Sequence, residues 1–169
     1  MYASEAGPTS FGAPAIPRYN TRTMRILLLN GPNLNTLGTR EPEIYGTRTL
    51  KDIESMVAER ARALGVDVRA FQANSEGALI DWLQGEAADA AGLIINAGAY
   101  THTSVALADA VAGCGLQVVE VHISNVWKRE AFRHESLLSP VVRGCIVGLG
   151  TDGYLLALEA LVRALKGAE

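Results

Sequence analysis

The chain has 169 residues, which suits one domain with a full-sized hydrophobic core. Hydrophobic residues make up 49% of it and charged residues 20%, which argues against a disordered protein. The net charge of −3 and the absence of lysine or arginine runs give no reason to expect nucleic-acid binding. No apolar stretch is long enough to span a bilayer, so we expect no membrane partner either.

Residues 1–23 differ from the rest of the chain. They contain three prolines and two glycines, show no hydrophobic periodicity and lack the apolar centre of a secretory signal. We expect a flexible N-terminal extension over 1–23, one domain over 24–169 and a cytoplasmic location. Upstream sequence before a start at Met24 is one alternative for 1–23, and a transit peptide is a weaker one, since Arg18 and Arg22 are accompanied by Glu5 and by prolines. The two cysteines, Cys114 and Cys145, have no metal-ligand spacing, and we expect both to be small core residues in a reducing compartment.

From Met24 onward, short apolar runs alternate with amphipathic segments. Strands are predicted where apolar residues run together, and helices where they recur every three or four residues. Thr49 is placed to cap the first helix and Gly65 to end it. The predicted strands are 25–30, 66–71, 93–96, 118–123 and 145–149, and the helices lie near 50–64, 79–83, 104–112 and 154–165, with a short turn at 129–133.

Strands that are apolar on both faces and alternate with helices are typical of a parallel sheet covered on both sides. Five such strands predict a single-domain α/β protein with a doubly wound, flavodoxin-like five-stranded parallel sheet. Ligands of such folds bind beyond the carboxyl ends of the strands. The candidate site therefore lies at three strand ends, residues 30–45, 96–104 and 120–133.

The first strand end, NGPNLNTLGTREPEIYG at 30–46, is long for a connection between a strand and a helix. Long loops on compact domains often act as lids or binding loops. Gly38 and Gly46 are possible hinges, and Arg40 and Tyr45 lie between them. A solvated surface loop is the alternative. The glycine spacing matches neither a dinucleotide fingerprint nor a Walker loop.

The fourth predicted strand contains VVEVHIS, in which Glu120 and His122 are two residues apart and so share one face. A carboxylate in an apolar strand needs a partner. Glu120 would orient the imidazole of His122 and favour its protonated form, which would make His122 a natural general acid. A purely structural ion pair is the alternative, and a zinc site that adds His102 is another, although no paired ligand motif such as HExxH is present.

Two further groups are candidates for binding an anion. NAGAYTHTSVA at 96–106 places several donors before a helix start, and capping by Thr103 or Ser104 does not require His102. Arg133 follows a short predicted turn and would suit a ligand carboxylate if it lay near a helix N-terminus in a cleft. A solvated surface charge is the alternative for Arg133.

Several long stretches resemble the type II dehydroquinases and occur in the order of that family. They are NGPNLNTLGTREPEIYG, NSEGALIDWL, NAGAYTHTSVALADA, VEVHISNVWKREAFRHESLLSP and GCIVGLGTDGYLLAL. The resemblance implies conversion of 3-dehydroquinate to 3-dehydroshikimate by anti elimination of water through an enolate, in aromatic amino acid biosynthesis or quinate breakdown. It also implies a flavodoxin-like fold, no metal or cofactor, and a homododecamer built from trimers.

The resemblance also implies roles for individual residues. Tyr45 matches the catalytic base and Arg40 the residue that activates it. His122 matches the proton donor, which Glu120 orients, and Asn33 falls where the family holds a water that stabilises the enolate. Asp109 matches a residue that approaches the site from a neighbouring subunit. The substrate-binding positions are matched by Asn96, His102, Ile123, Ser124 and Arg133. Residues that depart from common family members, at Thr36, Thr39, Ala99 and Trp127, are not at catalytic positions.

Three other functions remain open from the residues alone. One is a flavodoxin-like regulatory or flavin-binding module, although a receiver domain needs clustered aspartates that are missing here. A second is a different lyase or isomerase that acts on another carbocyclic acid. A third is a catalytically silent homologue. A Schiff-base mechanism is disfavoured, because none of Lys51, Lys128 and Lys166 lies in a buried motif.

Overall fold

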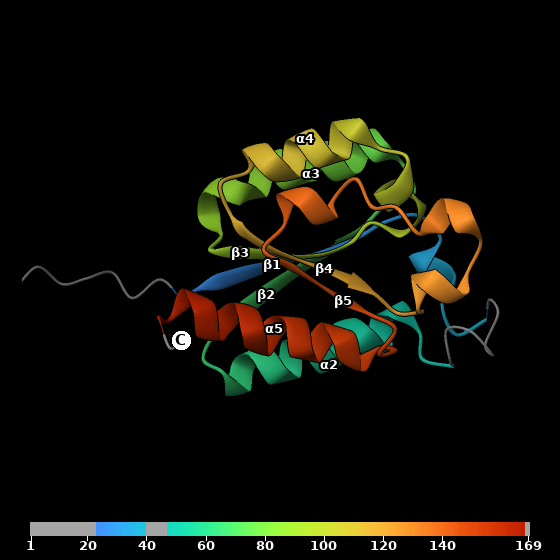
Figure 1. Ribbon diagram of the computed structural model, residues 1–169. Helices are drawn as coiled ribbons and strands as arrows, with labels where there is room; N and C mark the ends of the chain where they lie inside the picture. Colours follow the sequence, from blue (N-terminus) through green and yellow to red (C-terminus); the bar gives the residue numbers. More distant parts are fainter. Residues whose placement is uncertain (1–22, 40–46, 168–169) are drawn as a thin grey trace, which may run out of the picture.

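A computed structural model describes residues 23–39 and 47–167 and contains one parallel sheet (Figure 1). The strand order is β2-β1-β3-β4-β5. This order and the layered helices confirm the predicted doubly wound, flavodoxin-like fold. The strands are β1 (Arg25–Asn30), β2 (Asp67–Gln72), β3 (Gly92–Asn96), β4 (Gln117–His122) and β5 (Gly144–Val147). Residues 1–22 of the predicted extension, and the predicted lid residues Arg40, Tyr45 and Gly46, lie outside the described residues.

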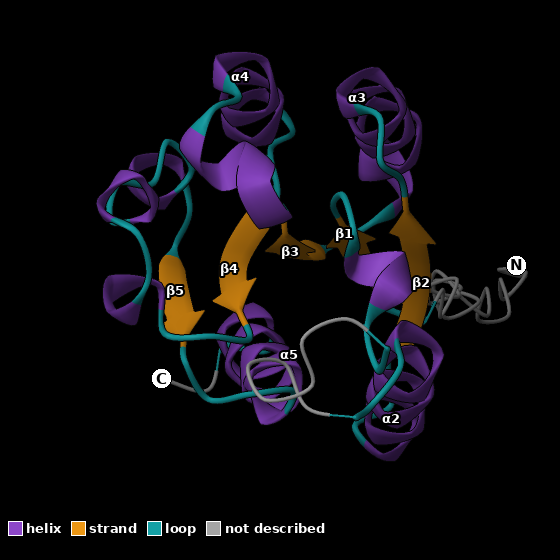
Figure 2. Ribbon diagram, turned by 90° about the vertical axis from the view of Figure 1, so that its right-hand side faces the viewer, coloured by secondary structure: helices purple, strands orange, loops and turns teal. Residues whose placement is uncertain are grey.

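Four long helices cover the two faces of the sheet (Figure 2). Helices α2 (Leu50–Ala63) and α5 (Asp152–Leu165) pack on one face, and α3 (Glu76–Glu86) and α4 (Val105–Gly113) pack on the other. Successive side chains of a strand point to opposite faces, so each central strand contributes to two hydrophobic cores. In β1, Ile26 and Leu28 pack under α2 and α5, whereas Leu27 and Leu29 pack under α3 and α4.

The predicted helix starts are confirmed in their local chemistry. Thr49 and Asp52 form a capping box, in which the Thr49 hydroxyl accepts from the Asp52 N–H at 3.2 Å and Asp52 Oδ2 accepts from the Thr49 N–H at 2.9 Å. The Ser104 hydroxyl caps α4 by accepting from the Leu107 N–H at 2.8 Å. The starts of α2 and α4 are therefore fixed by the polar residues that precede the apolar periodicity.

Some expectations about the sheet and its surroundings are wrong in detail. The outer strands β2 and β5 contain mostly exposed or half-buried residues, because an edge strand has one paired neighbour and less helix above it. Cys145 lies on β5 and is exposed, and Cys114 at the end of α4 is half-buried, so the two cysteines are not core residues. The short helical turn predicted at 129–133 is present as the 3-10 turn η5 (Ala131–Arg133), and a second 3-10 turn, η4 (Val126–Lys128), precedes it. Within the described residues, no helix has the length and apolar character needed to cross a membrane.

The sheet reverses its winding between β1 and β3, which are neighbours although β2 lies between them in sequence. The last residues of these two strands, Asn30 and Asn96, are partners in register. The chain passes closely there, since a Cβ atom on Gly31 would lie 2.3 Å from the Ala97 carbonyl oxygen. Such a reversal opens a crevice beyond the strand ends, where ligands of this fold class bind.

Candidate active site

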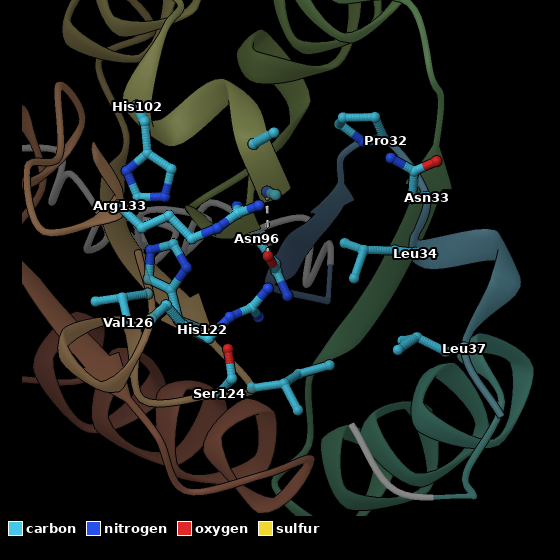
Figure 3. Close-up of a pocket in the computed structure, with 14 residues that line it drawn as sticks. Pro32, Asn33, Leu34, Leu37, Asn96, His102, His122, Ser124, Val126 and Arg133 are labelled. Atoms are coloured by element: carbon cyan, nitrogen blue, oxygen red, sulfur yellow. Dashed lines mark hydrogen bonds between the residues drawn. The ribbon is translucent and has the colours of Figure 1, made fainter. Parts of the chain in front are cut away.

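A pocket lies at this crevice and receives side chains from all three predicted strand ends (Figure 3). The connection after β1 contributes apolar and amide groups to the pocket. Residues of the turn η3 (Gly98–His102), which follows β3, line it as well. The end of β4 and the loop that follows it supply the remaining wall. The lining residues are Pro32, Asn33, Leu34, Leu37, Asn96, Gly98, Ala99, His102, His122, Ile123, Ser124, Val126, Arg129 and Arg133.

Most of the predicted site residues meet in this pocket. Those that line it are Asn33, Asn96, His102, His122, Ile123, Ser124 and Arg133. Glu120 lies behind His122 and is buried. Asp109 lines a separate groove, with residues of α3 and α4, and is exposed. Arg40 and Tyr45 lie outside the described residues.

Asn33 begins the short turn η1 (Leu34–Thr36) in a left-handed backbone conformation, with φ of 66°. Asparagine tolerates this region better than most residues other than glycine. Its backbone N–H donates to Asn74 Oδ1 at 3.0 Å, and its carbonyl accepts from the Thr36 hydroxyl at 2.7 Å. These bonds fix the turn that brings Leu34 and Leu37 into the pocket wall.

Glu120 and His122 form a buried pair, with 2.9 Å between Glu120 Oε1 and His122 Nε2. A carboxylate can only accept, so His122 Nε2 carries the hydrogen of this bond. The Nδ1 atom of His122 is then the nitrogen that can exchange a proton with a ligand in the pocket. The pairing predicted from the two-residue spacing is thus confirmed.

The carboxylate of Glu120 receives three more donors, which local sequence patterns had not indicated. The Thr101 hydroxyl donates to Oε1 at 2.9 Å, and the Cys145 thiol donates to Oε2 at 3.3 Å. The Ser136 hydroxyl accepts from two backbone N–H groups, at 3.1 and 2.9 Å, so its own hydrogen is free for Glu120 at 3.2 Å. Every neighbour donates, which is the environment that an anion requires.

The protonation of Glu120 follows from two opposed effects. Burial alone would raise the pKa of this carboxyl, but the hydrogen bond from His122, the positive charge of His122 and the donors at Thr101 and Cys145 hold it below its ordinary value of 4.5. Glu120 is therefore an anion at neutral pH and stabilises positive charge on the imidazole of His122. The same carboxylate acts on Cys145, where burial, together with the Glu120 charge, raises the thiol pKa to about 12.

His102 stands beside His122, with ring centroids 6.3 Å apart and planes inclined by 21° (Figure 3). Its Nδ1 lies 2.5 Å from the Glu135 carbonyl oxygen, which only accepts, so Nδ1 carries the hydrogen and Nε2 is left for a ligand. Imidazole lone pairs lie in the ring planes, so two stacked rings do not aim them at one metal ion. Among residues 23–39 and 47–167, no three His, Cys, Asp or Glu side chains form a group that could hold a metal, so the described part of the chain does not support the zinc alternative.

Two arginines give the pocket its positive charge. Arg133 points into it (Figure 3), and Arg129, which the sequence did not single out, lines it as well. Both contact the same partly exposed carboxylate, since Glu130 Oε2 lies 2.9 Å from Arg133 Nε and 3.5 Å from Arg129 Nε. Arg133 is the last residue of η5. Two guanidinium groups beside one carboxylate favour an anionic ligand.

Comparison with known proteins agrees with this geometry. Residues 24–162 match the model of the family described as dehydroquinase class II. A 3-dehydroquinate dehydratase of Dinoroseobacter shibae is 56% identical over 146 residues, which are 86% of this chain and 97% of that protein. One of Azorhizobium caulinodans is 57% identical, over 80% of this chain and 92% of that protein.

Solved structures give the same result. The type II dehydroquinase of Butyrivibrio crossotus superposes with a TM-score of 0.80 at 45% identity, covering 82% of this chain and 97% of that one. That of Propionibacterium acnes has a TM-score of 0.79 at 46% identity, covering 83% and 98%. A family match over most of the chain, supported by relatives at this identity over almost their full length, establishes that this chain belongs to the class II dehydroquinase family.

Proposed function

We propose that this protein is a 3-dehydroquinate dehydratase, a hydro-lyase that converts 3-dehydroquinate to 3-dehydroshikimate. Relatives that share more than half of its aligned residues bear that name. The structural observation that carries the proposal is the His122–Glu120 pair, which opens onto a pocket flanked by Arg129 and Arg133. Such a pocket suits a small carboxylic acid whose reaction needs a proton donor.

The reaction needs a base, an acid and stabilisation of an enolate oxygen. The base removes a proton from the carbon next to the ketone, and the electrons of that C–H bond form the enolate. The enolate then re-forms the ketone as the neighbouring C–O bond breaks. The departing oxygen takes a proton from the acid and leaves as water, which gives a conjugated enone. Anti elimination requires the base and the acid on opposite faces of the ring.

We assign the acid to His122, whose free Nδ1 is the atom that donates the proton. Glu120 orients the ring and stabilises its charge through the bond to Nε2. The four donors around Glu120 keep that carboxylate from competing for the proton. When His122 has given up its proton it is neutral, and solvent restores it for the next cycle.

We assign the base to Tyr45, with Arg40 as its activator. An ordinary tyrosine has a pKa near 10, so acting at pH 7 requires a lowering of about 3 units, equivalent to roughly 4 kcal/mol. A nearby guanidinium supplies much of this in a site with little water. Gly38 and Thr47 lie on either side of residues 40–46 and pack against each other. A Cβ atom on Gly38 would lie 3.0 Å from the Thr47 carbonyl oxygen. The flanks of residues 40–46 are thus adjacent, next to Leu37 of the pocket wall.

The remaining predicted residues bind the substrate in this proposal. Arg133 pairs with its carboxylate, and Asn96, His102, Ile123 and Ser124 hold its hydroxyl and carboxylate groups. Asn33 holds the water that stabilises the enolate oxygen. The reaction needs no metal or cofactor, because each proton transfer has a side chain that performs it.

We also propose a homo-oligomer, a dodecamer of four trimers, in which Asp109 acts on the site of the next subunit. Two observations support this. Asp109 is exposed in a groove of α3 and α4, away from the pocket of its own chain, and that groove is lined by small residues such as Ala87, Ala106 and Ala110. Mixing Asp109→Ala with Tyr45→Phe subunits should restore activity above the sum of the two variants. A fully active monomer in sedimentation would contradict the proposal.

Purified protein treated with a chelator, then given 3-dehydroquinate, tests the function. The absorbance of the conjugated enone should rise, and Tyr45→Phe should lower kcat by at least about a hundredfold, the order expected for a general base. An inactive wild type, or activity restored only by Zn²⁺, would overturn the proposal. Activity on a different carbocyclic acid, with none on 3-dehydroquinate, would favour another lyase, and a yellow protein would indicate flavin.

A further inference from the structure

A buried chain of hydrogen bonds lies beneath the pocket, on the face of the sheet opposite to Glu120. Tyr154, at the start of α5, is fully buried, and its hydroxyl donates to Asn30 Oδ1 at 3.0 Å. The same hydroxyl accepts from Asn96 Nδ2 at 2.8 Å. Asn96 Oδ1 accepts in turn from the Gly98 N–H at 3.2 Å, as the dashed line in Figure 3 shows. The chain thus links α5 to the ends of β1 and β3, where the sheet reverses.

The bonds define which way the Asn96 amide faces. A phenol has one hydrogen, and the Asn30 oxygen can only accept it, so the Tyr154 oxygen must accept from Asn96. This places Nδ2 of Asn96 toward Tyr154. The Gly98 N–H independently requires Oδ1 on the other side. A flipped amide would lose both bonds, so the orientation is fixed from two directions.

Burial keeps the Tyr154 hydroxyl protonated, as the hydrogen bond to Asn30 requires. Because the ring is fully buried, the pKa of its phenol is raised well above the usual range, whereas the bond from Asn96 acts in the opposite direction. The hydroxyl therefore keeps the hydrogen that it donates to Asn30. A phenolate would be unable to donate, and Asn30 would no longer determine the direction of the chain.

The arrangement includes one destabilising feature, at Asn30. Asn30 Nδ2 is buried and has no hydrogen-bond partner among residues 23–39 and 47–167. A buried donor without a partner is destabilising, and one in a native protein calls for an explanation. A phenylalanine at 154 with an apolar residue at 30 would remove the unpaired donor of Asn30, but Asn96 Nδ2 would then lose its acceptor. Polar groups kept at such a cost are expected where they serve a site.

We infer that Tyr154 is a positioning residue of this enzyme, which holds the Asn96 amide so that its second N–H is presented to the substrate as a donor. Asn96 lines the pocket, and its Nδ2 donates one of its two hydrogens to the Tyr154 hydroxyl. The other is then available to an acceptor oxygen of a bound ligand. This inference rests on the proposed dehydratase function, because substrate kinetics provide its test.

Tyr154→Phe removes only the hydroxyl and leaves the ring in place. We expect KM for 3-dehydroquinate to rise at least fivefold with kcat within twofold, because the base and the acid lie elsewhere. The matched control is Val162→Ala, which removes buried atoms from the same face of α5, two turns away. It should lower the midpoint of urea unfolding and leave both constants within twofold. If KM rises in both Tyr154→Phe and Val162→Ala, in proportion to the loss of stability, the inference is wrong.

A double-mutant cycle shows whether Tyr154 acts through Asn96. Asn96→Ala should raise KM, and adding Tyr154→Phe to it should produce no further rise. If the two effects multiply, or if Asn96→Ala leaves KM unchanged, the inference is wrong. Should Tyr154→Phe fail to fold, Asn30→Ala removes the acceptor that directs the hydroxyl and should raise KM likewise; an unchanged KM would again overturn the inference. An inactive wild type would instead contradict the proposed function itself.

Discussion

Cys145 is an exposed residue whose thiol faces the Glu120 carboxylate, and its reactivity reports the charge at the centre of the site. The thiol pKa is about 12, against an ordinary 9.0. At pH 8.0 about one molecule in 10⁴ would carry a thiolate, compared with about one in ten for an ordinary thiol. The few thiolates present are more nucleophilic, by roughly 15- to 30-fold for this difference in pKa. Alkylation should therefore be about 30- to 60-fold slower than at an ordinary exposed thiol.

The assay is alkylation with iodoacetamide at pH 8.0, followed by intact mass, in a Cys114→Ser background that leaves one thiol. Glu120→Gln removes the charge but keeps an acceptor oxygen, and it should accelerate alkylation several-fold. Full recovery is not expected, because burial is the larger cause of the raised pKa. Alkylation of the parent protein at the rate of an ordinary thiol would refute the reasoning. An equally slow Glu120→Gln variant would assign the effect to burial alone.

Three further outcomes are expected. Arg133→Ala should raise KM by about tenfold or more, since a charge-assisted hydrogen bond contributes about 1.5 to 3 kcal/mol, and an unchanged KM would remove Arg133 from the binding site. The anionic form of Glu120 stabilises the fold above its ordinary pKa of 4.5, so the free energy of urea unfolding should fall as the pH drops below that value, and less steeply in Glu120→Gln. Gly31→Ala should destabilise the protein by about 3 kcal/mol, because its Cβ would meet the Ala97 carbonyl at 2.3 Å; an unchanged urea midpoint would show that the backbone there yields easily.

The elements that local patterns determine were predictable. Apolar runs and helical spacing located every strand and long helix of the described residues to within a few positions, because burial on a sheet or under a helix leaves a periodic trace. The alternation of strands and helices along the chain then predicted the fold class. Glu120 and His122 were predictable for the same reason, since two residues on one strand face are neighbours whatever the tertiary structure.

Residues that reach the site through tertiary packing were not predictable in this way. Ser136 and Cys145 bond to Glu120 across 16 and 25 positions of sequence. The register that pairs Cys145 with Glu120 cannot be predicted from the sequence of either strand alone. Tyr154 occupies an apolar position of an amphipathic helix, and nothing nearby distinguishes its hydroxyl from a packing ring. Its partner Asn96 is 58 positions away. Such contacts become visible only when the helix has been placed on the sheet.

The strand order has a consequence for how the protein is made. β1 emerges from the ribosome first and lies inside the sheet; β2 then joins one side of it and β3 the other, and β4 and β5 add outward in turn. No strand has to insert between two that are already paired, so the sheet can grow during synthesis. The last helix, α5, then supplies the hydroxyl that bonds to Asn30, 124 positions earlier in the chain. A nascent chain with a complete sheet would hold the Asn96 amide only through the Gly98 N–H and not through Tyr154. We therefore expect substrate binding to mature only once the C-terminal helix has left the ribosome and docked.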